Sequence, residues 1–391
     1  MLKITKRVQR AGGEGAFLVM AKAQELERQG KKMIYMQIGE PDFNTPDNIK
    51  QTGIQAIEQN FTHYSPTMGR MDFRKAVAEY ISRTRGILVT AEEVLITPGA
   101  KDVLYSACMT LLEDGDEAIY PNPSYPVYES CINMSGAKAV PLPILEDKDF
   151  GFDRDTFVKL VSPRTRLVVI NSPANPTGGI IAREDLELVA EMAKKYDFYV
   201  LSDEIYSRLV FQGEHFSIAS LPGMKERTII MDGMSKTYAM TGWRLGYAAG
   251  PHELIEWMGK VIANTASCTA SFTQIAGIEA LTGPQNDVEK MRREFMARCE
   301  IIVDGLNAIP GVTCRKPHGA FYVFPNVKSF GRSSQEIADY LLYNAGVACL
   351  SGASFGSFGE GYLRFSYATS RENITLALGR IRTALAELKM K

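Results

Sequence analysis

One pattern recurs through the middle of this 391-residue chain: a short apolar run, then a turn, then a helix-like segment. The apolar runs hold no charged residue, which is typical of strands buried on both faces of a sheet. Strands that alternate with helices in this way predict a mostly parallel sheet with helices on both sides. The runs occupy residues 94–96, 118–120, 167–170, 198–201 and 228–231. We therefore predict a large α/β domain.

The two ends of the chain follow another pattern, which predicts a smaller α+β domain. A long helix is expected at 288–308, and short strand-like runs follow it. These runs lie at 312–315, 320–324, 347–350 and 362–367, with helices at 334–344 and 372–389. We assign residues 1–45 to an N-terminal arm and part of the small domain, 46–283 to the large domain, and 284–391 to the rest of the small domain.

Composition excludes several classes of function. Lysine and arginine total 44 and aspartate and glutamate total 45, so the net charge of −1 argues against binding nucleic acid or an anionic membrane. The six cysteines form no CxxC motif and only four histidines occur, so we expect neither a disulfide framework nor a metal site. The chain has no run of ~18 apolar residues that would cross a membrane. Its basic first ten residues lack the apolar core of a secretory signal, and we expect a cytoplasmic protein.

Polar and aromatic residues that suit ligand binding gather just after the predicted strands. In open α/β sheets, ligands bind at the carboxyl ends of the strands. We therefore expect these residues to meet in one place, although they lie far apart in the chain. They are Gly99, Ala100, Lys101, Tyr125, Asn175, Asp203, Tyr206 and Lys236.

Lys236 follows the apolar run at 228–231, in the stretch MDGMSKTYAMTGWRLGYAAG. A lysine at the end of a buried strand loses the hydration of its ammonium group, so its pKa falls from the reference ~10.4 toward neutrality. Such a lysine serves as an amine nucleophile and forms an imine with an aldehyde. An ordinary surface lysine is the alternative, because a lysine near glycine is a weak motif alone. The other residues at the strand ends favour the reactive lysine.

Gly99, Ala100 and Lys101 open a predicted helix and suit a phosphate. The free backbone N–H groups and the positive end of the helix attract an anion there. Arg244, eight residues after Lys236, would add a bidentate clamp on the same phosphate. For Gly99 to Lys101 the alternative is a simple strand-to-helix turn. For Arg244 the alternative is a surface salt bridge, which its glycine-flanked, apolar setting disfavours.

Asp203 ends a strand whose other residues are apolar, and a buried carboxylate is costly without a partner. The N–H of a pyridinium ring would be such a partner. Asn175 and Tyr206 could then bind a phenolic oxygen on the opposite edge of the ring, and Tyr125 offers a flat face for stacking. For Tyr125 the alternative is an ordinary half-buried aromatic residue.

Arg364 lies inside the strand-like stretch GYLRFSYA of the second domain. The forked donors of a guanidinium suit the α-carboxylate of a substrate. A structural ion pair is the alternative, with Asp42, Asp203 or Glu204 as the acidic partner.

Together these residues meet the needs of pyridoxal phosphate: an imine-forming lysine, a phosphate site, a partner for the ring nitrogen, a stacking ring and a carboxylate clamp. In that interpretation Asp203 keeps the ring nitrogen protonated, so the ring accepts electrons from the substrate Cα. Lys236 moves the Cα proton, and Tyr206 completes the predicted catalytic residues. The amino acid becomes a 2-oxo acid, and a second oxo acid runs the sequence backwards.

The motifs that carry these residues resemble fold-type I pyridoxal-phosphate enzymes, specifically class I/II aminotransferases of the aspartate aminotransferase type. The resemblance runs from IGEPDF at 38–43 to GYLRFSYATS at 361–370. Each motif alone is weak, whereas the ordered set is highly specific. Between these two lie HYSPTMGR, TPGAKD, PNPSYPVY, NSPANPTGG, LSDEIY, SKTYAMTGWRLGY and GAFYVFPN.

The resemblance implies a homodimer whose active sites lie at the subunit interface, with residues 46–283 as the cofactor-binding domain. It implies that Tyr64 reaches the phosphate of the neighbouring subunit's cofactor and that Gly39 lies over the substrate. Ser235 is expected to contact the phosphate. The bonds Asn122–Pro123 and Asn175–Pro176 are expected to be cis. The implied reaction is transamination between an L-amino acid and a 2-oxo acid, with 2-oxoglutarate as the acceptor.

Departures from the family pattern leave the amino-acid donor open among aspartate, alanine and aromatic types. Tyr125 stands where many relatives strict for aspartate have tryptophan, and Gly12 and Gly13 stand where some have a basic residue. Gly233 replaces a phosphate-binding hydroxyl of some relatives. A pyridoxal-phosphate lyase or synthase, such as a C–S lyase, is the first alternative function. A non-enzymatic sensor is the second, and the absence of a basic N-terminal domain disfavours it.

Overall fold

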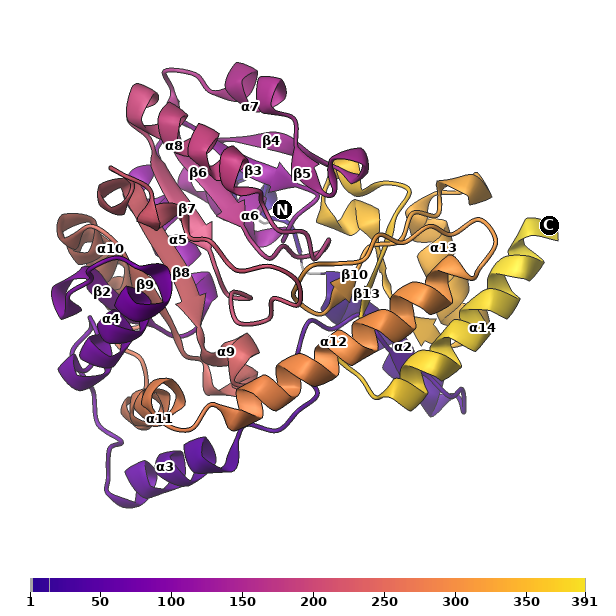
Figure 1. Ribbon diagram of the computed structural model, residues 1–391, viewed down its shortest axis with the longest axis horizontal. Coiled ribbons are helices and arrows are strands. Elements are labelled where there is room, and N and C mark those ends of the chain that lie inside the picture. Colours follow the sequence, from indigo (N-terminus) through magenta and orange to yellow (C-terminus); the bar gives the residue numbers. More distant parts are fainter. Residues whose placement is uncertain (1–2, 14, 391) are drawn as a thin grey trace.

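The computed structural model describes residues 3–13 and 15–390. Figure 1 shows a central sheet between helices, beside a second group of helices and short strands. The central sheet has eight strands in the order β2-β9-β8-β7-β6-β3-β4-β5. They are β2 (Val94–Thr97), β3 (Glu117–Asn122), β4 (Lys138–Leu145), β5 (Gly151–Phe152), β6 (Thr165–Asn171), β7 (Tyr199–Asp203), β8 (Thr228–Gly233) and β9 (Gly246–Ala249). The predicted α/β architecture is confirmed.

Most neighbouring strands of the central sheet run parallel, as predicted. Strands β8, β7, β6, β3 and β4 share one direction. Strand β9 runs antiparallel to both β8 and β2, and β5 runs antiparallel to β4. Because β9 returns beside β8, the connecting residues 234–245 turn back at the carboxyl end of β8. Lys236 and Arg244 both lie in this connection.

Both faces of the sheet are buried, which explains the uninterrupted apolar runs in its strands. In β6, Leu167 and Val169 pack on one face, and Val168 and Ile170 pack on the other. The first face is covered by α5 (Ala100–Leu111), α6 (Val127–Ser135) and α10 (His252–Thr265). The second face is covered by α4 (Met71–Arg85), α7 (Arg154–Leu160), α8 (Arg183–Tyr196) and α11 (Ser271–Thr282), with α3 (Asp47–Glu58) against α11.

The two chain ends combine in a smaller α+β unit, as predicted. Strand β1 (Ile34–Tyr35) pairs in parallel with β11 (Val347–Ala348). A separate antiparallel sheet has the order β10 (Tyr322–Val323), β13 (Leu363–Ser366), β12 (Leu350–Ser351). The helices of this unit are α2 (Gly15–Arg28), α12 (Asn286–Asn307), α13 (Ser334–Tyr340) and α14 (Arg371–Met390). The boundaries at 45/46 and 283/284 stay a prediction.

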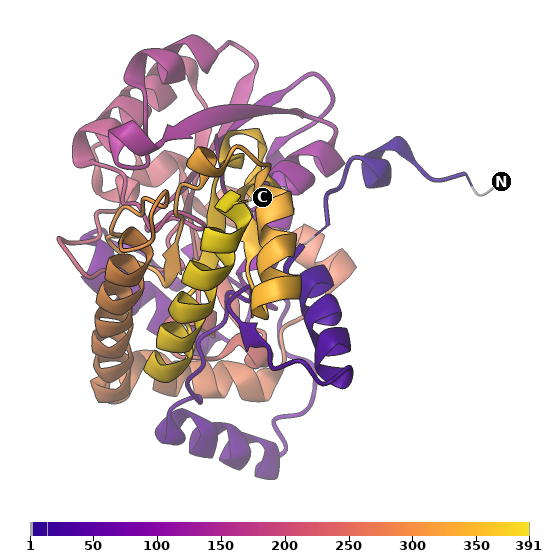
Figure 2. The same ribbon diagram turned by 90° about the vertical axis from the view of Figure 1, so that its right-hand side faces the viewer.

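The N-terminal segment projects from the body of the molecule, as Figure 2 shows, and carries the short helix α1 (Lys6–Gln9). None of the helices in the described part of the chain is long and apolar enough to cross a membrane. The peptide bonds Asn122–Pro123 and Asn175–Pro176 are cis, as expected. Ser172–Pro173 is also cis, which the sequence analysis did not predict.

The strand predicted at 312–315 is wrong. Only an isolated bridge between Thr313 and Asn326 forms there. The side chain of Asn307 takes the place of a neighbouring strand, since its amide nitrogen donates to the Cys314 carbonyl at 2.9 Å and its oxygen accepts from the Cys314 N–H at 2.8 Å. Local side-chain bonds of this kind compete with strand pairing.

Candidate active site

A cavity of about 520 Å³ lies at the carboxyl ends of the parallel strands, between the central sheet and the smaller unit. Side chains that are hundreds of residues apart in the chain meet there, because parallel strands end at one edge of the sheet. Eleven of the residues that we predicted for the site line this cavity. They are Gly39, Ala100, Lys101, Tyr125, Asn175, Asp203, Tyr206, Ser235, Lys236, Arg244 and Arg364.

Two further predicted residues do not line the cavity. Gly99 lies immediately before α5 with a φ of 96°, and a Cβ there would come within 2.3 Å of Arg244 Nη2. Glycine is therefore required for the arginine to approach the start of the helix. Tyr64 is 91% exposed. Its contact with a cofactor in a neighbouring subunit stays a prediction.

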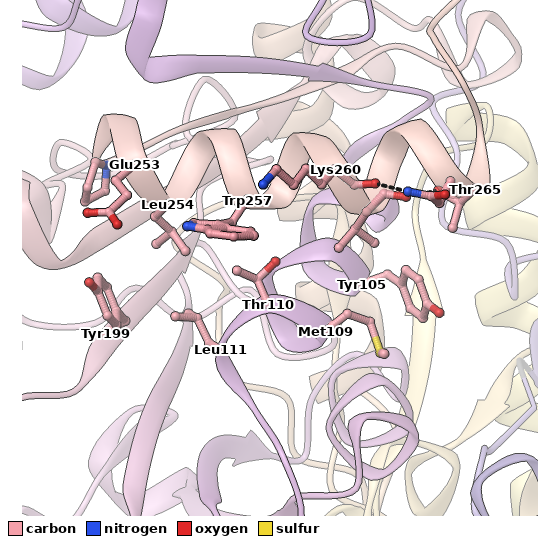
Figure 3. A pocket seen from close by; sticks show the side chains of 13 residues that line it. Tyr105, Met109, Thr110, Leu111, Tyr199, Glu253, Leu254, Trp257, Lys260 and Thr265 are labelled. Atoms are coloured by element: carbon pink, nitrogen blue, oxygen red, sulfur yellow. Dashed lines mark hydrogen bonds between the residues drawn. The ribbon is translucent and has the colours of Figure 1, made fainter.

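A second hollow of about 770 Å³ lies between α5 and α10 (Figure 3). Its wall is mainly apolar and aromatic, with Tyr105, Met109 and Trp257 among its residues. Its charged residues are Glu253 and Lys260, and the Lys260 ammonium lies 3.6 Å from the centre of the Trp257 ring. None of the predicted site residues lines this hollow, so its size alone does not make it the active site.

Lys236 lies in the short helix α9 (Met234–Thr237), which directly follows β8. Its Nζ donates to the carbonyl oxygen of Gly39 at 2.5 Å. Burial lowers the pKa of Lys236 to about 8, and the positive charges of Arg364 and Arg244 act in the same direction. The neutral amine is therefore far more populated near neutral pH than in a solvated lysine, as nucleophilic chemistry requires.

Asp203 ends β7 and is only 4% exposed. Its carboxylate accepts the hydroxyl of Tyr128 and, at 3.2 Å, the backbone N–H of Ile205. Burial raises the pKa of Asp203 to about 7, although both hydrogen bonds act in the opposite direction. A positively charged N–H beside this carboxylate would favour its ionised form. A pyridinium nitrogen therefore fits this position.

Tyr128 is a site residue that the sequence analysis missed. It lies in α6, three positions after Tyr125, and the centroids of the two rings are 5.8 Å apart with their planes at 89°. The hydroxyl of Tyr128 is buried against Asp203. The spacing from Tyr125 was the available signal, but no local pattern reveals the carboxylate that Tyr128 contacts.

The start of α5 and the Arg244 guanidinium form a site for an anion. Arg244 Nη2 donates to the Pro98 carbonyl at 3.1 Å and Nη1 donates to the Thr241 carbonyl at 3.0 Å, which fixes the side chain beside the first turn. Gly246 in β9 allows this arrangement, because a Cβ there would lie 2.4 Å from the Ala100 nitrogen. Free N–H groups at a helix N-terminus and a nearby arginine suit a phosphate.

Arg364 lies in β13 and is 4% exposed. Its Nη1 donates to Asn175 Oδ1 at 3.3 Å, and Nη2 donates to the Gln37 carbonyl. The guanidinium carbon lies 4.7 Å from the centre of the Tyr322 ring and 4.9 Å from that of Phe355. These contacts orient a buried cation toward the cavity.

The acids that we considered as structural partners of Arg364 have other partners. Asp42 pairs with Arg298 at 2.6 Å, and Glu204 pairs with Arg85 at 2.5 Å. Asp203 accepts the Tyr128 hydroxyl, as described above. Asp42 and Glu204 thus each form an ion pair with another arginine.

Arg85 forms a buried charge network behind the cavity that the sequence analysis also missed. Its Nε lies 2.5 Å from Glu204 Oε2, and its Nη2 lies 3.0 Å from Asp232 Oδ2 and donates to Ser207 at 2.8 Å. His215 Nε2 lies 3.0 Å from Glu204 Oε2. The network ties α4 to the ends of β7 and β8, the strands that carry Asp203 and lead into Lys236.

Over residues 31–381, the chain matches the model of the family described as aminotransferase class I and II. The chain is a class I/II aminotransferase. It is 41% identical to an aspartate aminotransferase of Pyrococcus horikoshii over 93% of this chain and 94% of the relative. It is 40% identical to aromatic-amino-acid aminotransferase 2 of Thermococcus litoralis over 92% and 93% of the two chains. The Thermus thermophilus aspartate aminotransferase solved with maleate superimposes with a TM-score of 0.94, at 37% identity over 98% of this chain and 100% of that one.

These comparisons confirm the predicted family, the fold and an enzyme that catalyses transamination. They favour transamination over the lyase, synthase and sensor functions that the sequence left open. Aminotransferases of this type use pyridoxal phosphate, so this is a pyridoxal-phosphate-dependent enzyme. The cavity fits that cofactor, with an anion site at α5 and Arg244 and a buried carboxylate at Asp203.

Asp203 gives a testable pH dependence in the cofactor-free protein. The folded-state pKa of about 7 lies above the ordinary 3.8, so between these values the folded protein holds a proton that the unfolded chain releases. Its contribution to stability is therefore present in acid and is lost as the pH rises from about 4 to 7. Asn cannot ionise, so Asp203→Asn should not lose stability in this way. We expect the free energy of unfolding of the variant to rise relative to that of the wild type between about pH 4 and 7.

Urea unfolding of the cofactor-free proteins at several pH values measures the effect. Asp147→Asn, at an exposed carboxylate, is the matched control and should follow the wild type. Equal pH slopes for Asp203→Asn and the wild type would contradict the prediction.

Proposed function

We propose that this aminotransferase transfers the amino group of an L-amino acid of the aspartate, alanine or aromatic type to 2-oxoglutarate. The observation that carries the proposal is that Lys236, Asp203 and Arg364 line one cavity. The names of relatives as aspartate and aromatic-amino-acid aminotransferases support this range of donors.

Pyridoxal phosphate supplies an aldehyde for the amino group and a ring that accepts electrons from the substrate Cα. Lys236 holds the cofactor and then moves the proton at Cα, for which its lowered pKa suits it. Asp203 accepts a hydrogen bond from the ring nitrogen and keeps it protonated. Arg364 binds the substrate α-carboxylate.

The remaining predicted residues hold the cofactor or cover the substrate. We assign the phenolic oxygen of the cofactor to Asn175 and Tyr206, and ring stacking to Tyr125. Gly39 lies over the substrate, and Tyr125 and Asn175 also border it. The phosphate is assigned to Gly99, Ala100, Lys101, Ser235 and Arg244, with the partner subunit's Tyr64.

The wall of the cavity supports more than one kind of donor side chain. Phe17, Ile38 and Phe355 give it an apolar part, which suits an aromatic or small apolar side chain. Lys101 adds a cation that suits an acidic side chain. This combination supports a donor range wider than aspartate alone.

We further propose a homodimer with shared active sites in the cytoplasm, with the domain boundaries given above. Several large apolar or aromatic side chains are exposed in the single chain: Phe17, which lines the cavity, is 57% exposed, Leu18 is 68% and Tyr64 is 91% exposed. A second copy of the chain would cover such surfaces. All six cysteines are free, which supports a reducing compartment.

Single-turnover absorbance measurements test the proposed donors and the role of Arg364 together. We expect aspartate, alanine or phenylalanine to convert the bound aldehyde form to the amine form, and 2-oxoglutarate to reverse the change. In Arg364→Lys, the donor concentration for half conversion should rise about 10- to 100-fold, because a bidentate charge-assisted contact is lost. The affinity for the cofactor should change little.

Arg315→Lys is the matched control, since this arginine is 44% exposed and lies outside the cavity. Ammonia or thiol release without an oxo acid would contradict the proposed function. Equal losses of donor and cofactor binding in Arg364→Lys would remove Arg364 from the substrate role.

A further inference from the structure

Tyr322 is a buried phenol in the cavity with no role in the chemistry assigned above. It lies in β10, is 1% exposed and lines the cavity next to Tyr206. The two hydroxyl oxygens are 2.7 Å apart, and the rings meet edge to face at 85°. The sequence motif GAFYVFPN contains Tyr322 but does not distinguish it from an ordinary core aromatic residue.

The side chain of Tyr322 is confined at its hydroxyl and at its ring. A Cβ at Gly39 would lie 2.2 Å from this oxygen, so the glycine leaves just enough room for the phenol beside the 38–40 segment. The Arg364 guanidinium covers the Tyr322 ring at 4.7 Å. Tyr322 therefore contacts both the residue assigned to the substrate carboxylate and a residue assigned to the cofactor.

Hydrogen-bond counting determines what the pair of phenols does. A phenol has one proton to donate and accepts through its oxygen. If Tyr206 donates its proton to a phenolic oxygen of the cofactor, then the proton between the two tyrosines must come from Tyr322. A phenol that accepts a hydrogen bond becomes a stronger donor itself, because linked hydrogen bonds polarise one another.

We propose that Tyr322 is a positioning residue that donates to Tyr206 and thereby directs the Tyr206 proton onto the phenolic oxygen of the cofactor. This inference rests on the proposed role of Tyr206. The ring of Tyr322 also packs against the Arg364 guanidinium, so Tyr322 links the cofactor side of the cavity to the substrate side.

The test uses the holoenzyme and follows the pH midpoint of the absorbance change of the bound cofactor. A donor to the phenolic oxygen stabilises its ionised form, so weakening that donor raises the midpoint. Tyr322→Phe keeps the ring and removes the hydroxyl. We expect it to raise the midpoint by roughly 0.4 to 1 pH unit. The donor KM should change less than about threefold, because the ring under Arg364 remains.

A double-mutant cycle separates this role from a structural one. In the Tyr206→Phe background, Tyr322→Phe should add no further shift, because the residue through which it acts is already gone. Additive shifts, or no shift in Tyr322→Phe when Tyr206→Phe shifts the midpoint, would overturn the inference. If Tyr206→Phe itself shifts nothing, the assigned role of Tyr206 fails and the inference fails with it.

Tyr367→Phe is the matched control. Tyr367 is as fully buried as Tyr322, but its hydroxyl donates to the Ala320 carbonyl at 3.2 Å. Removal of the Tyr367 hydroxyl should leave the midpoint unchanged. If Tyr367→Phe shifted the midpoint as much as Tyr322→Phe does, the shift would reflect general loosening of the core. Gly39→Ala provides a second route, since its methyl group would displace the Tyr322 hydroxyl. It should raise the midpoint in the same direction, and an unchanged midpoint would count against the proposal.

Discussion

Lys236→Ala abolishes transamination and removes the visible absorbance of the bound cofactor; this is the largest effect that we expect. The amine of Lys236 lies in the cavity with a pKa of about 8, and no methyl group can hold an aldehyde or move a proton. Loss of a positioned general acid–base group costs up to about 10⁴-fold in rate, and loss of the covalent attachment adds to this. Exchange of amino groups between an amino acid and 2-oxoglutarate measures the loss.

Lys260→Ala is the control for Lys236→Ala. Lys260 is an exposed lysine of the same domain, stacked on Trp257 in the hollow between α5 and α10 (Figure 3). Its replacement should leave both the absorbance and the exchange rate unchanged. Turnover by Lys236→Ala at the wild-type rate would refute the mechanism.

Arg85→Met is expected to give the largest loss of stability. The substitution leaves the buried carboxylates of Glu204 and Asp232 without the guanidinium that lies 2.5 and 3.0 Å from them. Removing one partner from a buried ion pair costs about 3–5 kcal/mol, because the remaining charge stays desolvated. Urea unfolding at pH 7, with the cofactor bound, measures the change in the free energy of unfolding.

The loss of stability in Arg85→Met, relative to the wild type, should become smaller as the pH falls. Arg85 lowers the pKa of Glu204, so the stability that Glu204 gains from this pair is present above its ordinary pKa and is lost as the pH falls through the lowered value. Without the guanidinium, the carboxylates of Glu204 and Asp232 take up protons at a higher pH than in the wild type, and this protonation removes the buried charge. The difference between wild type and variant is therefore greatest near neutral pH.

Arg183→Met provides the comparison, because Arg183 is 62% exposed and pairs with Glu187 on the surface of α8. Such pairs contribute about 0–1 kcal/mol. If Arg85→Met loses no more stability than Arg183→Met, the buried network does not stabilise the ends of β7 and β8.

The sequence was a good guide where a property depends on neighbours in the chain. The run at 167–170 predicts a strand buried on both faces, and the structure has β6 there with alternate residues in two different cores. Asn175, Asp203 and Lys236 follow strands, and parallel strands bring such residues to one edge. Strand order did not need to be known for this prediction.

The local sequence pattern did not predict elements whose conformation depends on packing against other parts of the chain. Helix α11 has apolar residues all round, because α3 covers one side and the sheet core lies on another, so it lacks the amphipathic period that marks a surface helix. The helices at 47–58 and 252–265 were also not predicted. The strand expected at 312–315 was wrong, since the Asn307 side chain binds the backbone there instead.

By itself, the sequence determined the α/β class, the family and the residues that meet at the strand ends, because strand period and strand-end chemistry are local properties. Only the tertiary structure decided which groups those residues contact. Tyr128 lies 75 positions from Asp203, Tyr322 lies 116 from Tyr206, and Arg85 lies 119 from Glu204. Each of these hydrogen bonds exists because separate elements pack side by side, and no spacing in the chain encodes that distance.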